Sequence, residues 1–552
     1  MSSFKGTTIW SSPMSPVDET NESLDDFLDS EPLFMIPLQD PLVFMDESKQ
    51  EHVTTNESIT SLAPTSVGNL QLTPRSPTRS GGDHARISPK PRVYETSPKS
   101  KRTRNPIRAI VDPIVANVAN VAQPTKLLER ISLALGDPAC YDNLEPCGVL
   151  MEAAVDCAAN NRTCRGYAPA CGSDDARSAI AHYYSMPNRK VDPEDVVVAS
   201  GCSGALELIL TALLRDNGSQ ESLVLVPQPG FPLYQVIAES HGASVVHYKL
   251  DSERDWSVDL SDLECLLDIH KDRVCGVVIT NPSNPCGSVF SKSHLKEILR
   301  LGARYDVPIV SDEVYGDMVF ASRGVKYHCM GHVAFEMLHD PNDSLPPPVI
   351  MASGLGKQFL VPGWRLGWIV FFDYSVEKQL QEINAGVKRL AQVILGASHL
   401  AQGVISAVLK PKSLEAEMEI KLWKTKLLKT LEEQSEYLNQ HLAHTPGLRV
   451  IPSCGAMYTM VEIDLSKFHS IDSDVKFTTR LLEEQNVFVL PGSAFGAPGY
   501  FRVVYCAPIK VLENACRRIA NFCARETSCR RFIGSINGAP GLAEMPTLVS
   551  KK

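Results

Sequence analysis

The chain has 552 residues, a formal net charge of -10 and 43% hydrophobic residues, so it is long enough to form more than one hydrophobic core. The charge is mild for this length and no long basic face appears in the apolar-rich part, which argues against a nucleic-acid binder. No apolar run approaches the roughly 20 residues that span a bilayer. We therefore expect small-molecule partners, and neither nucleic acid nor membrane.

The fifteen cysteines are scattered, without CxxC pairs or Cys/His clusters at zinc spacing, so no metal site is expected. We expect no secretory leader before them. The start of the chain soon becomes acidic, whereas mitochondrial transit peptides are Arg-rich and acid-poor. Reduced cysteines in the cytoplasm are the interpretation that fits this usage.

Residues 1–104 form a Ser/Thr/Pro-rich tail without a sustained helix or strand period. Such a composition buries little apolar surface, so we expect disorder. Its acidic residues 25–28, with interleaved apolar ones, are either a partner-binding helix or a solvated stretch. The basic run 99–104 is either a nuclear import signal or a plain linker. The last residues, 526–552, are expected to be flexible.

From Asn105 onward, apolar strands alternate with amphipathic helices. Helices are predicted over 205–214, after a Ser-Gly-Cys-Ser-Gly turn, and over 291–305. The clearest buried strands are predicted at 195–199, 222–226, 274–280, 307–311 and 349–352. This alternation implies an α/β fold whose mostly parallel sheet is covered by helices on both faces. Ligands of such sheets bind beyond the carboxyl ends of the strands.

Two of these strand ends carry candidate binding groups. Gly201 and Cys202 lie between a strand and a helix, where backbone N–H groups and the helix dipole can bind a phosphate; an ordinary tight turn is the alternative. Asp312 follows an apolar strand, where a buried carboxylate is costly unless a cation or donor meets it. A protonated ring nitrogen would be such a partner.

Lys357 follows another strand in the sequence Gly-Leu-Gly-Lys, and Arg365 comes eight residues later in Pro-Gly-Trp-Arg-Leu-Gly-Trp. A lysine amine can attack carbonyl groups, and an arginine offers a planar fork for phosphate oxygens. Surface cations are rarely embedded in glycine, proline and tryptophan. The ordered combination of these strand ends indicates one common site.

The chain resembles the fold-type I aminotransferases, in the subgroup that contains tyrosine aminotransferase. The similarity covers about 105–524 and is strongest at 105–112, 281–320, 361–368 and 455–458. It implies pyridoxal 5'-phosphate as cofactor and a large domain with a mostly parallel sheet plus a smaller α+β domain.

The resemblance also implies how the chain divides. The large, cofactor-binding domain is expected to span 145–410. The small domain is expected to combine an N-terminal arm, 105–144, with the C-terminal part, 411–525.

The resemblance further implies a role for each candidate residue around the cofactor. Lys357 matches the lysine that binds the cofactor covalently and moves the proton at the substrate Cα. Asp312 matches the carboxylate that keeps the ring nitrogen protonated, so that the ring accepts electrons. Asn284 and Tyr315 match the partners of the ring 3-oxygen, and Phe231 matches the aromatic side chain stacked on the ring.

Other matches concern the cofactor phosphate. Gly201, Cys202 and Arg365 would bind it. The family often has a hydroxyl residue where Cys202 stands, so the backbone N–H of Cys202, and not its side chain, is the expected donor. Tyr167 matches the tyrosine that reaches the phosphate of the neighbouring subunit, which implies a homodimer.

Arg502 matches the arginine that binds the substrate α-carboxylate, assisted by the backbone at Gly136. It lies within an apolar strand, where an unpaired charge is costly; a structural ion pair is the alternative. The implied reaction transfers the amino group of tyrosine, and of other aromatic amino acids, to 2-oxoglutarate, giving 4-hydroxyphenylpyruvate and glutamate in tyrosine catabolism.

Two alternatives stay open. The motifs define the reaction but leave the side-chain pocket undefined, so alanine, methionine or a broad range of amino acids are alternative substrates. The chain could also be a cofactor-binding scaffold that acts through its N-terminal tail, although the intact set of Lys357, Asp312 and Arg365 argues against this.

Overall fold

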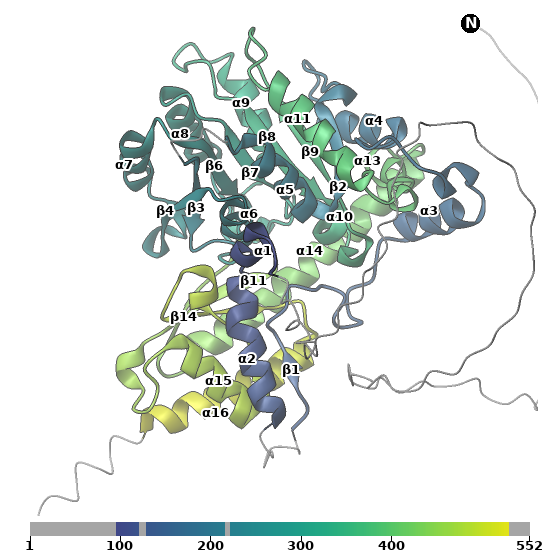
Figure 1. The fold of residues 1–552 in the computed structure, drawn as a ribbon. Helices are drawn as coiled ribbons and strands as arrows, with labels where there is room; N and C mark the ends of the chain where they lie inside the picture. Colours follow the sequence, from purple (N-terminus) through teal and green to yellow (C-terminus); the bar gives the residue numbers. More distant parts are fainter. Residues whose placement is uncertain (1–94, 121–127, 216–220, 529–552) are drawn as a thin grey trace, which may run out of the picture. The chain divides into compact units, whose positions relative to one another are not determined.

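The computed structural model describes residues 95–120, 128–215 and 221–528 (Figure 1). The predictions for the tail up to residue 94, the acidic residues 25–28 among them, and for residues 529–552 lie outside this part. Within the described ranges, no helix is long and apolar enough to cross a membrane.

An eight-stranded sheet forms the larger part of the fold. Four neighbouring pairs, from β8 to β4, are parallel, and β9 and β5 pair antiparallel with their neighbours. The mostly parallel sheet predicted from the sequence is thereby confirmed. Across the sheet, the strands are β2 (Val196–Ser200), β9 (Leu366–Phe372), β8 (Val349–Gly354), β7 (Ile309–Asp312), β6 (Val274–Thr280), β3 (Leu223–Gln228), β4 (Ser244–Asp251) and β5 (Ser257–Val258).

Helices cover both faces of this sheet (Figure 1). Successive strand residues point to opposite faces, so Val198 joins one hydrophobic cluster and Val197 the other. The first face is covered by α4 (Asp174–Tyr183), α7 (Leu260–His270), α8 (Lys292–Arg304), α9 (Met330–Met337) and α13 (Ile405–Leu409). The second face is covered by α5 (Gly201–Leu213), α6 (Leu233–Ser240) and α11 (Gln381–Ala391).

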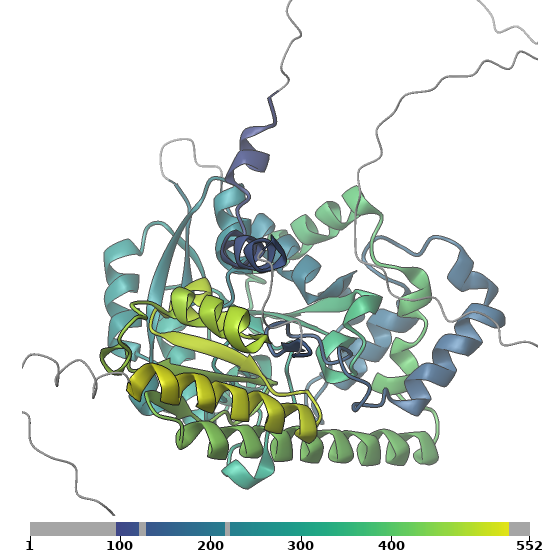
Figure 2. The same ribbon diagram turned by 90° about the horizontal axis from the view of Figure 1, so that it is seen from below.

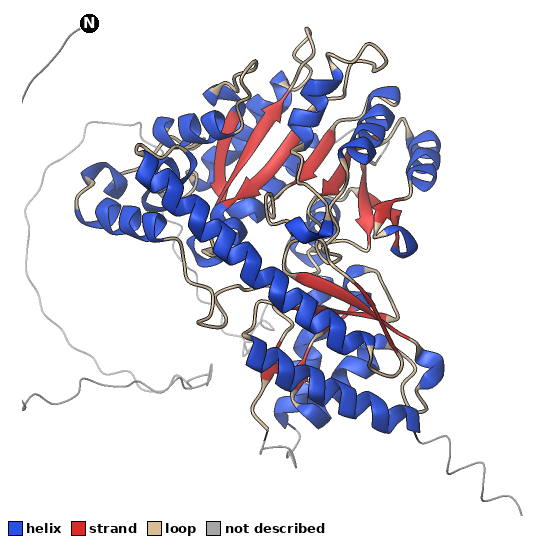
Figure 3. Ribbon diagram, turned by 180° about the vertical axis from the view of Figure 1, so that it is seen from behind, coloured by secondary structure: helices blue, strands red, loops and turns tan. Residues whose placement is uncertain are grey.

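A second, four-stranded antiparallel sheet lies in the C-terminal part of the chain. Its strands, in order, are β10 (Leu448–Ile451), β11 (Tyr458–Ile463), β14 (Tyr500–Val504) and β13 (Leu490–Pro491). Figure 3 shows the 30-residue helix α14 (Leu414–Ala443) running from this sheet toward α3 (Gly148–Ala159). In Figure 2, the C-terminal helix α16 (Ile509–Ser528) lies along α14.

The N-terminal segment joins the smaller sheet region. β1 (Ile131–Ser132) pairs with β12 (Val487–Phe488), and α2 (Pro106–Asn120) packs against α15 (Asp474–Gln485). These contacts support the proposed small domain made of both chain ends, with the eight-stranded sheet in the proposed large domain.

Two boundaries differ from the predicted ones in a way that matters for the site. The helix expected from residue 205 begins at Gly201, so the predicted turn is the first turn of α5. The strand expected to end at residue 311 includes Asp312. Both differences bring the candidate residues onto regular elements, because a helix directly follows β2 and the ladder with β8 continues through Asp312.

The structure also differs from the prediction of disorder at residues 98–102, which form the short helix α1 (Pro98–Arg102). The Ser97 hydroxyl caps the helix by accepting a hydrogen bond from the Ser100 N–H. The Arg102 guanidinium donates to the carbonyls of Glu239 and Ser240 at the end of α6. The composition of residues 98–102 does not predict this helix, because the cap and the docking on α6 stabilise it.

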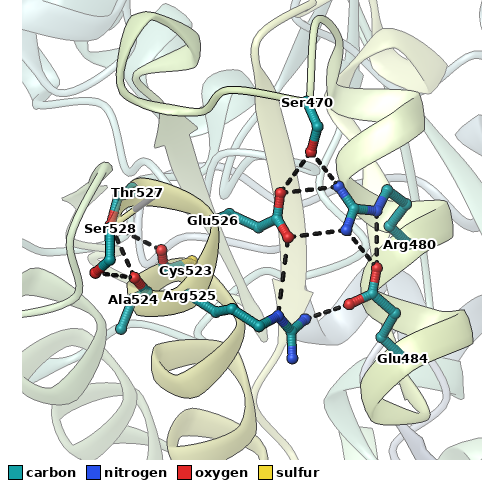
Figure 4. Close-up of polar contacts among 9 residues, drawn as sticks. All are labelled: Ser470, Arg480, Glu484, Cys523, Ala524, Arg525, Glu526, Thr527 and Ser528. Carbon is teal, nitrogen blue, oxygen red and sulfur yellow. Dashed lines mark hydrogen bonds and ion pairs between the residues drawn. The ribbon is translucent and has the colours of Figure 1, made fainter. Parts of the chain in front are cut away.

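A network of charged side chains links α15 to α16 (Figure 4). The Arg480 guanidinium donates to both carboxylate oxygens of Glu526, at 2.9 and 2.8 Å. Glu484 accepts from Arg480 and from Arg525. The hydrogen bond from Arg480 holds the pKa of Glu526 below its usual range. This partly buried bidentate pair should stabilise the packing of the two helices.

We predict that Glu526→Gln lowers the melting temperature at pH 7 by roughly 2 to 8 °C, since a hydrogen bond to a charged group contributes about 1 to 3 kcal/mol. The depressed pKa adds stability above the unfolded-state pKa of about 4.3 that is lost as the pH falls through the folded-state value. The melting temperatures of the wild type and of Glu526→Gln, measured by calorimetry from pH 7 to pH 3, should therefore converge as the pH falls.

Glu433→Gln is the matched control, because Glu433 pairs with Lys429 at 3.9 Å with both side chains well exposed. This substitution should change the melting temperature by less than about 2 °C. Equal effects of the two substitutions would contradict the stabilising role of Glu526.

Candidate active site

A cavity of about 290 Å³ lies beyond the carboxyl ends of β6, β7 and β8 and is lined by residues from both sheet regions. Every site residue predicted from the sequence lines it except Tyr167. No group of three or more His, Cys, Asp or Glu side chains suited to a metal ion occurs among the described residues. Its mixed apolar and polar lining, which brings together Asp312, Lys357 and Arg502, makes this cavity the candidate site for an organic ligand.

Asp312 lies at the end of β7 with only 3% of its surface exposed. One carboxylate oxygen accepts from the Tyr234 hydroxyl at 2.7 Å. The other accepts from the Val314 N–H at 3.2 Å and from the Cys202 thiol at 3.5 Å. Burial raises the pKa of Asp312, and these three donors oppose that rise. A carboxylate has about four acceptor positions, so one remains for a cationic donor in the cavity.

Tyr234 is a site residue that the sequence analysis missed. Its hydroxyl is fully buried and lies 2.8 Å from the Thr280 hydroxyl as well as next to Asp312. A signal was present, because Tyr234 stands three residues after Phe231 in the sequence and lies in the first turn of α6. The rings of Phe231 and Tyr234 meet edge to face, 6.0 Å apart.

Gly201 and Arg365 form a cradle at the start of α5. The first N–H groups of a helix lack intrahelical partners and can bind an anion. Gly201 has φ +74°, and a Cβ there would lie 2.6 Å from Arg365 Nη2. Only glycine combines this backbone conformation with this close approach. Arg365 also has a positive φ of 50°, and its guanidinium donates to the Pro362 carbonyl at 3.2 Å.

The side chain and the backbone of Cys202 face different groups. Its side chain points to Asp312, while its backbone N–H belongs to the first turn of α5. Burial and the neighbouring Asp312 raise the pKa of the Cys202 thiol well above its usual range. The thiol is therefore a neutral donor beside Asp312, and the backbone is the part of Cys202 placed to meet a phosphate.

Lys357 lies on the short helix α10 (Leu355–Gln358), directly after β8. Its amine is partly buried and donates to the Gly136 carbonyl. Gly136 itself packs tightly, because a Cβ there would lie 2.1 Å from the Tyr458 hydroxyl. The amine thus stands in the cavity at the junction of the two sheet regions.

Arg502 lies on β14 and is 4% exposed. Its guanidinium donates to the Asn284 side-chain oxygen at 2.8 Å and to the Ala134 carbonyl at 2.7 Å. Its Nε is buried without a partner, and the guanidinium pairs with no carboxylate in the described part of the chain. Burial lowers the pKa of Arg502. An unneutralised buried cation that lines a cavity is suited to bind an anionic group of a ligand.

Aromatic side chains surround Arg502. The guanidinium carbon lies 4.4 Å from the ring centroid of Tyr458 and 4.5 Å from that of Phe495. The Tyr458 hydroxyl is 2.6 Å from the Tyr315 hydroxyl. The sequence analysis assigned no role to Tyr458 or Phe495, although Tyr458 ends the Gly-Ala-Met-Tyr motif that carried part of the resemblance.

Tyr167 lies outside the cavity, directly after the 3-10 turn Arg162–Arg165, and is 89% exposed. Such exposure of a large aromatic side chain suits contact with another molecule. Its predicted contact with a neighbouring subunit stays a prediction.

Comparisons with known proteins give the family context for this cavity. The chain is 39% identical to the tyrosine aminotransferase of Homo sapiens over 453 residues, 82% of this chain and 91% of the relative. It is 37% identical to that of Dictyostelium discoideum over 429 residues, 78% of this chain and 96% of the relative. The crystal structure of tyrosine aminotransferase from Leishmania infantum superposes with a TM-score of 0.68 and 29% identity, covering 79% of this chain and all of that one.

The family model for aminotransferase class I and II matches residues 129–519. This match spans the eight-stranded sheet and most of the smaller sheet region. It includes Lys357, Asp312 and Arg502, which converge on the cavity. The chain belongs to the class I and II aminotransferases.

Proposed function

We propose that this chain transfers the amino group of L-tyrosine, and of other aromatic amino acids, to 2-oxoglutarate with pyridoxal 5'-phosphate as cofactor. The products are 4-hydroxyphenylpyruvate and glutamate, as in tyrosine catabolism. The observation that carries the proposal is the convergence of the Lys357 amine, the Asp312 carboxylate and the unneutralised Arg502 guanidinium on one cavity. The identity to proteins named tyrosine aminotransferase supports the choice of substrate.

The residues present fit the proposed cofactor. The start of α5 with Gly201 and Arg365 suits a phosphate. Asp312 keeps an acceptor position for a protonated ring nitrogen. Tyr315 and Asn284 also line the cavity and can meet the ring 3-oxygen, and Phe231 can contact the ring.

When bound, the cofactor supplies an electron sink for the charge released at the substrate Cα. Asp312 would hold the proton on the ring nitrogen. Lys357 would bind the cofactor covalently and then carry the proton to and from Cα as a general base and acid. Its hydrogen bond to the Gly136 carbonyl holds the amine in the cavity, which residues of both sheet regions line.

Arg502 would bind the α-carboxylate of both the amino acid and the oxo acid, which are the small-molecule partners. Arg502 is buried, its Nε has no hydrogen-bond partner, and no carboxylate pairs with its guanidinium in the described part of the chain. The cavity wall also contains the apolar side chains of Ile107, Leu135 and Leu490, which favour an apolar or aromatic substrate side chain.

The proposal includes a homodimer. Exposed apolar side chains lie near Tyr167 in the chain region after α11, where Val393 is 81%, Ile394 58% and Leu395 59% exposed. His399 hydrogen-bonds to the Gly166 carbonyl and Gly396 closely approaches the Ala170 carbonyl, so the chain around Tyr167 runs beside residues 396–399, directly after this patch. Burial of such a patch against a second copy would be favourable. The cytoplasm remains the expected location, from the cysteine usage of the sequence.

The proposal is tested by steady-state kinetics of the purified full chain over an amino-acid panel with 2-oxoglutarate. The specificity constant should be highest for tyrosine or phenylalanine. A preference for alanine or methionine would overturn the substrate, and a visible cofactor absorbance without turnover of any amino acid would favour the scaffold alternative.

Lys357→Ala is expected to leave a folded chain that still binds the cofactor through its phosphate and ring contacts. Its turnover should fall by at least roughly 10² to 10⁴-fold, because the proton at Cα loses its base. Lys292→Ala, at an exposed lysine paired with Glu336, should stay within two-fold. Borohydride reduction of the wild type and peptide mapping should label Lys357, and a label on another lysine would overturn the assignment.

Arg502→Lys is expected to lower the specificity constants of amino-acid and oxo-acid substrates together. An ammonium group cannot reproduce the planar guanidinium fork, and the lost contacts are worth about 1.5 to 3 kcal/mol, or roughly ten- to a hundred-fold. Arg449→Lys, at an exposed arginine on β10, is the control. If only one half-reaction suffered, the shared carboxylate role would be wrong.

A chain that begins at residue 95 is expected to keep its turnover number within a few-fold, because the cavity is lined by residues from Ile107 onward. Starting at residue 95 also retains the docking of Arg102 on α6. Turnover and circular dichroism should be measured on the same preparation. Loss of activity in a correctly folded shortened chain would contradict this prediction and show that turnover needs residues 1–94.

A further inference from the structure

The Gly-Ala-Met-Tyr motif, Gly455 to Tyr458, forms a turn that places Tyr458 at the start of β11. The Gly455 N–H donates to the Gly287 carbonyl at 3.0 Å, and the Ala456 N–H donates to the Met318 carbonyl at 2.8 Å. Both acceptors belong to loops after strands of the larger sheet. The turn therefore fixes the Tyr458 side chain, 2% exposed, in the wall of the cavity.

The hydroxyl of Tyr458 has one hydrogen-bond partner among the described residues, the Tyr315 hydroxyl at 2.6 Å. Burial first, and the neighbouring Tyr458 second, raise the pKa of Tyr315 well above its usual range, while Arg502 opposes the rise and Asp312 adds to it. Tyr315 therefore keeps its proton near neutral pH. Each hydroxyl has a single proton, so Tyr315 can donate into the cavity only if Tyr458 donates to Tyr315.

The ring of Tyr458 has a separate contact with Arg502. On the antiparallel ladder, Tyr458 pairs with Val504 and Met460 pairs with Arg502, so Tyr458 and Arg502 are diagonal neighbours on one face of the sheet. The guanidinium lies between the rings of Tyr458 and Phe495. A cation over an aromatic face is attracted to it, and more strongly when desolvated.

We propose that Tyr458 is a positioning residue with two separable functions. Its hydroxyl directs the Tyr315 proton toward the 3-oxygen of the bound cofactor, and its ring holds the Arg502 guanidinium for the substrate carboxylate. The inference rests on the proposed function, since it assumes a cofactor at Tyr315 and a carboxylate at Arg502.

The hydroxyl function is tested by the pH midpoint of the visible absorbance of the cofactor-loaded enzyme without substrate. A hydrogen bond to the ring 3-oxygen stabilises its anionic form, so a weaker donor raises the midpoint. Tyr315→Phe should raise it by about one to two pH units. Tyr458→Phe should raise it by about 0.1 to 0.6 units, because a donor that itself accepts a hydrogen bond is strengthened by roughly 10 to 30%.

A double-variant cycle separates action through Tyr315 from a general disturbance. If the Tyr458 hydroxyl acts only through Tyr315, the double variant should have the same midpoint as Tyr315→Phe alone. If the midpoint shifts of the two single variants added in the double variant, the action of Tyr458 through Tyr315 would be refuted. An unchanged midpoint in Tyr458→Phe, while Tyr315→Phe shifts it, would refute it as well.

The ring function is tested by calorimetric binding of 3-(4-hydroxyphenyl)propanoate, which has the carboxylate but no amino group. Tyr458→Phe keeps the ring, so its dissociation constant should stay within two-fold. Tyr458→Leu should weaken binding by roughly 3- to 30-fold. Phe495→Leu is the matched control: it should weaken binding similarly but leave the absorbance midpoint unchanged. Equal affinities of the Phe and Leu variants at Tyr458 would overturn the ring function.

The outcomes also separate this inference from the proposed function. A wild-type chain without visible cofactor absorbance would refute the proposed function. A wild type that binds the cofactor and the carboxylate, with variants at Tyr458 that change neither readout, would refute the inference alone.

Discussion

The buried guanidinium of Arg502 is the constraint around which the site is organised. Its side chain is 4% exposed and has no carboxylate partner in the described part of the chain. A positive charge in such a place is costly, and the surroundings offset that cost only in part, with the Asn284 and Ala134 oxygens and two aromatic rings. A substrate carboxylate would complete the neutralisation of this charge.

Another part of the cavity lining has the complementary arrangement. Asp312 is a buried carboxylate whose neighbours are neutral donors, Tyr234, Cys202 and the Val314 N–H. Among the residues that the structure describes, Asp312 therefore has no cationic partner, as Arg502 has no anionic one. In this cavity, a cationic ring would pair with Asp312 and a substrate carboxylate with Arg502. These two complementary charges support the proposed transamination more strongly than any single motif.

The sequence was most informative where the residue type alone determines the local structure. The apolar periodicity of the strands predicts the mostly parallel sheet, which the structure confirms. The glycine-rich strand ends mark the places where Asp312, Lys357 and Arg365 stand. Side-chain directions did not follow from the sequence: the Cys202 thiol donates to Asp312, 110 residues further along the chain, and local patterns do not predict such a contact. Tyr234 and Tyr458 were missed because their partners lie 78 and 143 residues away, and such contacts appear only in the folded chain.

The most direct measurement of the proposed activity follows the nitrogen itself. The purified chain would be incubated with pyridoxal 5'-phosphate, ¹⁵N-labelled L-tyrosine and 2-oxoglutarate, and the products analysed by mass spectrometry. We expect 4-hydroxyphenylpyruvate and ¹⁵N-labelled glutamate to form in equal amounts, and neither to form with Lys357→Ala. Formation of the oxo acid without label in glutamate, or no loss of label from tyrosine, would contradict the proposed activity.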